Sequence, residues 1–153
     1  MKAFKRISAA AALLLAGCGG PVPSGVFLTM SVSTRDVAVA TSVNGKEDEF
    51  LSGASGSMSG SRPINRLVRE GENEAVFVVT PVAGDDAEPG LRATLEISIK
   101  GEMVDTLAPG ARTIFTRELT EEETAAIKAG ETVTITERFT VDGAALKAMK
   151  QGG

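Results

Sequence analysis

The chain has 153 residues, with 16 Lys and Arg against 20 Asp and Glu, and a net charge of −4 at pH 7. This length accommodates one domain with a proper hydrophobic core. The acidic balance argues against a nucleic-acid partner, because an acidic surface repels phosphate backbones. The sequence contains no His, Trp or Tyr and only one Cys. It therefore cannot build a Ser-His-Asp triad, a His-activated cysteine nucleophile or the common zinc sites. We expect a protein that is not an enzyme and that uses no cofactor or metal.

The first residues have the features of an export signal. Lys2, Lys5 and Arg6 form a basic start, and an apolar run from Ile7 to Ala16 follows. The basic start stays on the cytoplasmic face while the apolar run enters the bilayer. At about 1.5 Å per residue, this run covers only about half of a hydrocarbon core about 30 Å thick. It is too short for a permanent transmembrane helix.

Leu15, Ala16, Gly17 and Cys18 resemble the bacterial lipobox, in which an apolar and two small residues precede a cysteine that is diacylated before cleavage. The resemblance implies that residues 1–17 are a signal peptide and that a lipid on Cys18 anchors the protein to a membrane of the bacterial envelope. Such acyl chains bind at about 0.8 kcal/mol per buried methylene, which suffices for stable anchoring.

The alternative is an ordinary secretory signal in which Cys18 is a bystander. A cleavage site among the alanines at positions 9–12 would then fall inside the apolar run, where a peptidase needs a more extended segment. Cys18 is also the only cysteine, so it cannot form an internal disulfide. Both points favour lipidation.

Gly19 occupies the position at which the enterobacterial version of this family carries an Asp for inner-membrane retention. The resemblance therefore favours the outer membrane over the inner one. Residues 18–25 form a tether of turn and extended formers without apolar periodicity. We expect residues 26–153 to fold as a single domain.

Apolar and polar residues alternate repeatedly after the tether, as is typical of strands with one buried face. The alternation is clearest in residues 26–33, 37–43, 91–100, 112–119 and 132–141. Within the last of these, Glu137 interrupts the buried row, which we interpret as a bulge or a strand end. Residues 74–79 are apolar on both faces, as expected of a central strand.

Local signals place turns and two short helices. Asn44-Gly45 predicts a hairpin, after which residues 46–51 would return as a charged edge strand. Thr120 and Glu123 predict a capping box, in which each side chain bonds the backbone N–H of the other residue. The helix would span residues 121–129 and end at Gly130, and its start explains the acidic residues there without an acid site. Asp142 would cap a second helix over residues 143–150.

Two loops are the candidate contact surfaces. Residues 52–61 are rich in Ser and Gly, with Met58 as the one large apolar side chain, so we expect an exposed loop without a packed element. Residues 81–90 contain Asp85, Asp86 and Glu88, whose carboxylates are of the kind that Ca²⁺ prefers. Without a recognisable ligand spacing, the simpler interpretation is that they are solvated. Binding residues are frequent in such loops.

Ile64, Asn65, Leu67, Gly71 and Asn73 resemble a segment of galactose-binding-like jelly rolls, including the sugar-binding domains of family 2 glycosidases. In those folds a turn with Asn and Leu leads through Gly-x-Asn into a buried strand, and the motif is mainly architectural. The resemblance implies a β-sandwich and suggests carbohydrate binding. The absence of Trp and Tyr counts against that function, because their flat rings usually stack on sugars.

Together, these patterns predict a mainly β protein, a single antiparallel β-sandwich of jelly-roll or immunoglobulin-like topology with one or two short helices. We expect a lipid-anchored, non-enzymatic lipoprotein that presents this sandwich to an envelope protein or polymer. A carbohydrate-binding accessory module is the alternative function. A glycosidase-like enzyme would require a pair of carboxylates, and no pair stands out from the other acidic residues.

Overall fold

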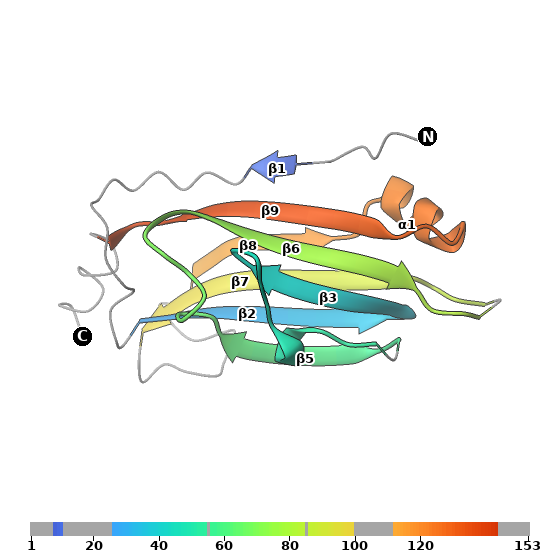
Figure 1. The fold of residues 1–153 in the computed structure, drawn as a ribbon, viewed down its shortest axis with the longest axis horizontal. Coiled ribbons are helices and arrows are strands. Elements are labelled where there is room, and N and C mark those ends of the chain that lie inside the picture. The colour runs from blue at the N-terminus through green and yellow to red at the C-terminus, as the bar shows by residue number, and fades with distance from the viewer. Residues whose placement is uncertain (1–7, 11–25, 55, 85, 100–111, 144–153) are drawn as a thin grey trace.

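The computed structural model describes residues 8–10, 26–54, 56–84, 86–99 and 112–143. The described strands form two sheets with the orders β1-β9-β6-β3-β4 and β5-β2-β7-β8 (Figure 1). All pairings between these strands are antiparallel except that of β1 with β9. The antiparallel β-sandwich expected from the sequence is confirmed.

The first sheet is built around β6 (Gly71–Pro81), which pairs with β9 (Val133–Val141) on one side and β3 (Val37–Val43) on the other. The two-residue strand β4 (Lys46–Glu47) ends the sheet next to β3. At the opposite edge, β1 (Ser8–Ala10) lies parallel to β9, opposite residues 136–138. This last strand belongs to the segment that we expect to be removed as a signal peptide.

The second sheet is built around β2 (Val26–Arg35) and β7 (Gly90–Ile99), which pair along their whole length. Its edges are β5 (Met58–Pro63) next to β2 and β8 (Arg112–Glu118) next to β7. The helix α1 (Glu121–Lys128) connects β8 to β9 of the other sheet, and the 3-10 helix η1 (Glu49–Leu51) follows β4. The chain thus crosses between the two sheets several times.

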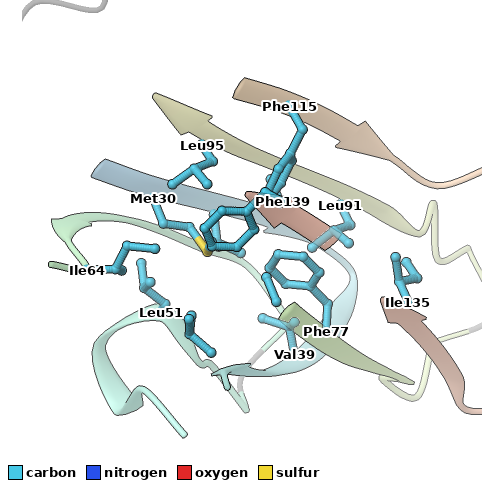
Figure 2. Packing of buried hydrophobic residues seen from close by; sticks show 14 of the residues in the cluster. Met30, Val39, Leu51, Ile64, Phe77, Leu91, Leu95, Phe115, Ile135 and Phe139 are labelled. Carbon is cyan, nitrogen blue, oxygen red and sulfur yellow. The ribbon is translucent and has the colours of Figure 1, made fainter. Parts of the chain in front are cut away.

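The inward rows of both sheets form one hydrophobic core, as the strand alternation requires. Its fully buried members include Leu28 and Met30 of β2 and Phe77 of β6. Phe115 of β8 and Phe139 of β9 join the two layers directly, with ring centroids 6.1 Å apart (Figure 2). Leu51 of η1 and Ile64, just after β5, reach the same core.

The Ser- and Gly-rich segment is not an exposed loop throughout, so the expectation that residues 52–61 contain no packed element was wrong. Met58–Pro63 forms β5, which pairs with β2 over six residues. Gly60 of this strand is buried. An edge strand can be held by backbone hydrogen bonds alone, and these need no large side chain.

Two further local predictions were wrong. Residues 46–51 do not form one returning strand, because β4 ends at Glu47 and η1 follows. Glu137 marks neither a bulge nor a strand end, since β9 pairs with β6 in unbroken register through that position. Its carboxylate stays in the buried row because it has a charged partner there. The observed irregularity lies elsewhere, between Leu95 and Glu96 where β7 meets β8.

The other local signals are confirmed where the structure describes them. Asn44 and Gly45 have φ angles of 50° and 77°, as the hairpin requires, and both bonds of the capping box at Thr120 are present. The helix α1 is followed by Gly130 with φ 86°. Residues 74–79 do belong to a central strand, although Val76 and Val78 are only half-buried. The lipobox and residues 144–150 of the second helix lie outside the described residues.

Candidate functional site

A hollow of about 900 Å³ opens on the surface where β4, η1, the end of β5 and the start of β2 meet. Its lining combines apolar and polar side chains: Phe27, Phe50, Pro63 and Leu67 with Glu47, Asp48, Glu49, Arg62, Asn65 and Arg66. Apolar surface bordered by convergent polar groups is typical of ligand sites. We therefore treat this hollow, named the Phe50 hollow below, as the candidate site.

Asp48 builds the wall that carries Phe50. Its Oδ1 accepts hydrogen bonds from the backbone N–H groups of Phe50 (3.0 Å) and Leu51 (3.2 Å), which caps η1. Leu51 is fully buried and anchors η1 in the core. Phe50 projects outward and is 58% exposed, the only large hydrophobic side chain exposed among the described residues.

Arg62 ties the end of β5 to the same wall. Its Nη1 lies 3.3 Å from Asp48 Oδ2, and its guanidinium carbon lies 5.9 Å from the centroid of the Phe50 ring. A cation at this distance from an exposed ring contributes about 0.5–1 kcal/mol. Because the Asp48 side chain is only 4% exposed, its charge needs a cationic partner. Arg62 supplies that partner and steadies the ring.

Gly60 allows β5 to approach η1 closely. A Cβ at this position would lie 2.8 Å from the carbonyl oxygen of Phe50 and 3.6 Å from Cε1 of its ring. Any larger residue would push η1 away from β5. The Ser- and Gly-rich segment thus helps to position the site.

The turn after β5 forms the other side of the Phe50 hollow. The backbone N–H of Ile64 donates to the carbonyl oxygen of Leu28 (2.7 Å), and Oδ1 of Asn65 accepts from the Leu28 N–H (2.9 Å). These two bonds continue the pairing of β2 beyond the end of β5. They hold Asn65 and the exposed Arg66 in the lining that also includes Phe27.

Asn73, from the segment that resembles galactose-binding-like folds, is buried away from this lining. Its Oδ1 accepts from the Arg69 N–H (2.8 Å) and from Nδ2 of Asn44 (2.8 Å). Its Nδ2 donates to the carbonyl oxygens of Arg69 (2.7 Å) and Gly71 (2.9 Å). All its polar groups are used to fix the entry into β6. Of the two asparagines in that segment, only Asn65 lines the Phe50 hollow.

The acidic loop over residues 81–90 lies at the opposite end of the sandwich from the start of β2 and the end of β5 (Figure 1). Glu88 is engaged there: its N–H donates to Asp36 Oδ2 (2.9 Å), and its carboxylate lies 3.7 Å from Lys128 Nζ. Asp85 lies outside the described residues. Among the described residues, no group of three His, Cys, Asp or Glu side chains could hold a metal ion.

A buried charge cluster joins the two sheets at the β8 edge. The guanidinium of Arg117 contacts Glu123 of α1 through Nη2 and Glu137 of β9 through Nε, the latter at 3.0 Å. The three side chains are 12%, 7% and 4% exposed. Burial raises the pKa of Glu137, and the neighbouring Arg117 opposes that rise only in part. Arg117 balances the charge of these carboxylates away from solvent, although Glu137 Oε1 has no hydrogen-bond partner. Because the three side chains are almost fully covered, we do not treat the cluster as a binding site.

The sequence predicted that Glu123 takes part in the capping box, but not that it forms an ion pair with Arg117. The one available signal was Glu137, whose place in a buried row required a cationic partner. The Phe50 hollow was missed altogether, because its residues come from three separate segments of the sequence. Residues 52–61, one of the two expected contact loops, contribute only indirectly, through Gly60.

No protein-family model, curated protein or solved structure matches this chain. In the part of the chain that the structure describes, no helix is long and apolar enough to cross a membrane.

Replacing Glu137 with Gln should change how stability depends on pH. Because burial raises the pKa of Glu137 above its ordinary value of 4.5, the native protein binds more protons than the unfolded chain between these two values. The wild-type free energy of unfolding should therefore fall, relative to that of Glu137→Gln, as the pH rises from 4.5 through the native pKa. Urea unfolding of both proteins at stepped pH measures this difference.

Glu118→Gln is the matched control, because this carboxylate belongs to an exposed pair with Arg92 on the second sheet. It should reproduce the wild-type dependence on pH. A wild-type free energy of unfolding that stays constant or rises with pH, relative to that of Glu137→Gln, would contradict the assignment.

Proposed function

We propose that this protein is a lipid-anchored, non-enzymatic lipoprotein of the bacterial cell envelope that presents a β-sandwich to an envelope protein or polymer. The resemblance of Leu15-Ala16-Gly17-Cys18 to a lipobox supports the anchor. After removal of residues 1–17, which include β1, the sandwich would begin at Val26, so residues 18–25 would form the link. Eight extended residues span at most about 30 Å. The binding surface would therefore stay close to the membrane, and Gly19 favours the outer one.

The charged side chains of the described residues support a non-enzymatic role. Three of the buried carboxylates, those of Asp48, Glu123 and Glu137, are each paired with an arginine. General acid–base catalysis needs a titratable side chain within reach of a substrate. The carboxylates of Glu123 and Glu137, at the β8 edge, are enclosed. The sequence also supplies no His, the commonest catalytic base.

The Phe50 hollow is the observation that carries the binding role. It combines the one exposed large hydrophobic side chain of the described residues with carboxylates and guanidinium groups. An exposed aromatic side chain in a polar setting is typical of a recognition surface. The same combination of ring and polar groups favours the second candidate function, a carbohydrate-binding accessory module.

The anchor is tested by Cys18→Ser. Without the thiol no acyl chain can be attached, so the variant should move from the membrane fraction to the soluble fraction and lose label from radioactive palmitate. Phe50→Ala is the control and should remain fully membrane-bound and labelled. Retention of Cys18→Ser in the membrane fraction after a carbonate wash would contradict the anchor.

The binding surface is tested by crosslinking in intact cells, with p-benzoylphenylalanine in place of Arg66 at the rim of the Phe50 hollow. Benzophenone inserts into C–H bonds of proteins and sugars alike, so either partner class would be captured. The same replacement at Arg92, an exposed side chain on the β8 side of the second sheet, is the control. We expect an envelope component to be captured from position 66 only. Equal capture from both positions, or none from position 66, would contradict the proposed surface.

A further inference from the structure

The Phe50 ring is held ready for contact before any ligand arrives. Asp48 fixes the backbone on which the ring stands, and Arg62 lies beside the ring while pairing with Asp48. Gly60 leaves the room that this arrangement needs. The ring is nevertheless 58% exposed. A pre-positioned group loses little conformational freedom on binding, which favours affinity.

The charges of the Phe50 hollow are nearly balanced. Glu47, Asp48 and Glu49 stand against Arg62 and Arg66, and Asp48 is already paired with Arg62. A strongly anionic ligand would meet the carboxylates, and a cationic ligand would compete with Arg62 for the ring. Neither sign of charge is favoured, which indicates a neutral ligand.

The remaining polar groups suit a ligand rich in hydroxyl groups. Carboxylates such as those of Glu47 and Glu49 only accept hydrogen bonds, whereas the guanidinium of Arg66 only donates them. A hydroxyl group does both. A sugar ring offers hydroxyl groups around its rim and an apolar C–H face that packs on an aromatic ring. Phe27, also in the lining, supplies a second aromatic surface.

We propose that the Phe50 hollow binds a chain of neutral sugar residues, with Phe50 as the stacking platform and Arg62 as the residue that positions it. Its volume of about 900 Å³ lies at the upper end of the range of about 300–1,000 Å³ for ligand sites. More than one sugar ring fits this space. This proposal rests on the proposed function, which gives the cell envelope as the source of the ligand. Of the two envelope partners named there, it selects a polymer rather than a protein.

Binding is tested by isothermal titration calorimetry on the full chain, solubilised in a polyoxyethylene detergent so that no sugar headgroup competes. The neutral probes are maltohexaose, cellohexaose and chitohexaose. Polygalacturonate is the anionic probe, and a Lys- and Arg-rich peptide is the cationic one. We expect saturable binding of at least one neutral hexasaccharide, tighter than that of either charged probe.

The residues are tested by two variants and a control. Phe50→Leu keeps apolar volume but removes the ring face, and should weaken hexasaccharide binding by about tenfold or more. Arg62→Met keeps the aliphatic stem but removes the guanidinium, and should weaken binding by a smaller factor. Arg92→Met, which breaks an exposed pair elsewhere on the second sheet, should change affinity by less than about twofold. Urea unfolding confirms that all three variants remain folded.

Three results would overturn the assignment: no binding of any neutral hexasaccharide, binding that is unchanged in Phe50→Leu, or tighter binding of a charged probe. If sugar binding fails while position 66 captures an envelope protein in cells, the sugar assignment is wrong and the proposed function stands. If position 66 also captures nothing, both are wrong.

Discussion

The structure depends on burying the inward rows of two sheets at once. The central strands β2 and β6 each pair on both sides, and buried residues alternate with more exposed ones over residues 27–33 of β2 and 72–80 of β6. A shift of one residue in either register would turn Met30 or Phe77 toward solvent. Leu51 and Ile64 enter the same core and fix η1 and the turn after β5. The surface features are therefore set by core packing rather than by the loops themselves.

Most of the strands could be predicted from the sequence because their signal is local: large apolar residues recur at every second position. The helix α1 was predictable for the same reason, through its capping box. The strand β5 was not, because Gly60 and its neighbours pair through backbone groups that carry no pattern. The Phe50 hollow was out of reach, since Phe27, Asp48 and Arg62 meet only through long-range pairing. No spacing of residues in the sequence indicates that these three side chains lie close together.

Two groups of charged side chains lie at opposite edges of the second sheet, and they differ in how far they are exposed to solvent. At the β8 edge, Arg117 and its two carboxylates lie almost out of solvent, so their cost of burial is offset only by one another. At the β5 edge, Asp48 is equally buried, but Arg62 is 47% exposed and lies beside an uncovered ring. The group at the β8 edge is covered and connects the two sheets. The group at the β5 edge leaves a surface that a ligand can reach.

The central claim is that the buried core stabilises the fold, whereas Phe50 contributes to a surface site. The most direct test is to measure the free energies of unfolding of Phe77→Ala and Phe50→Ala side by side in urea. The two changes remove the same atoms from a fully buried and a 58% exposed ring. Phe77→Ala should lower the free energy of unfolding by about 3–5 kcal/mol, and Phe50→Ala by no more than about 1 kcal/mol. Equal losses, or a larger loss in Phe50→Ala, would contradict this division of roles.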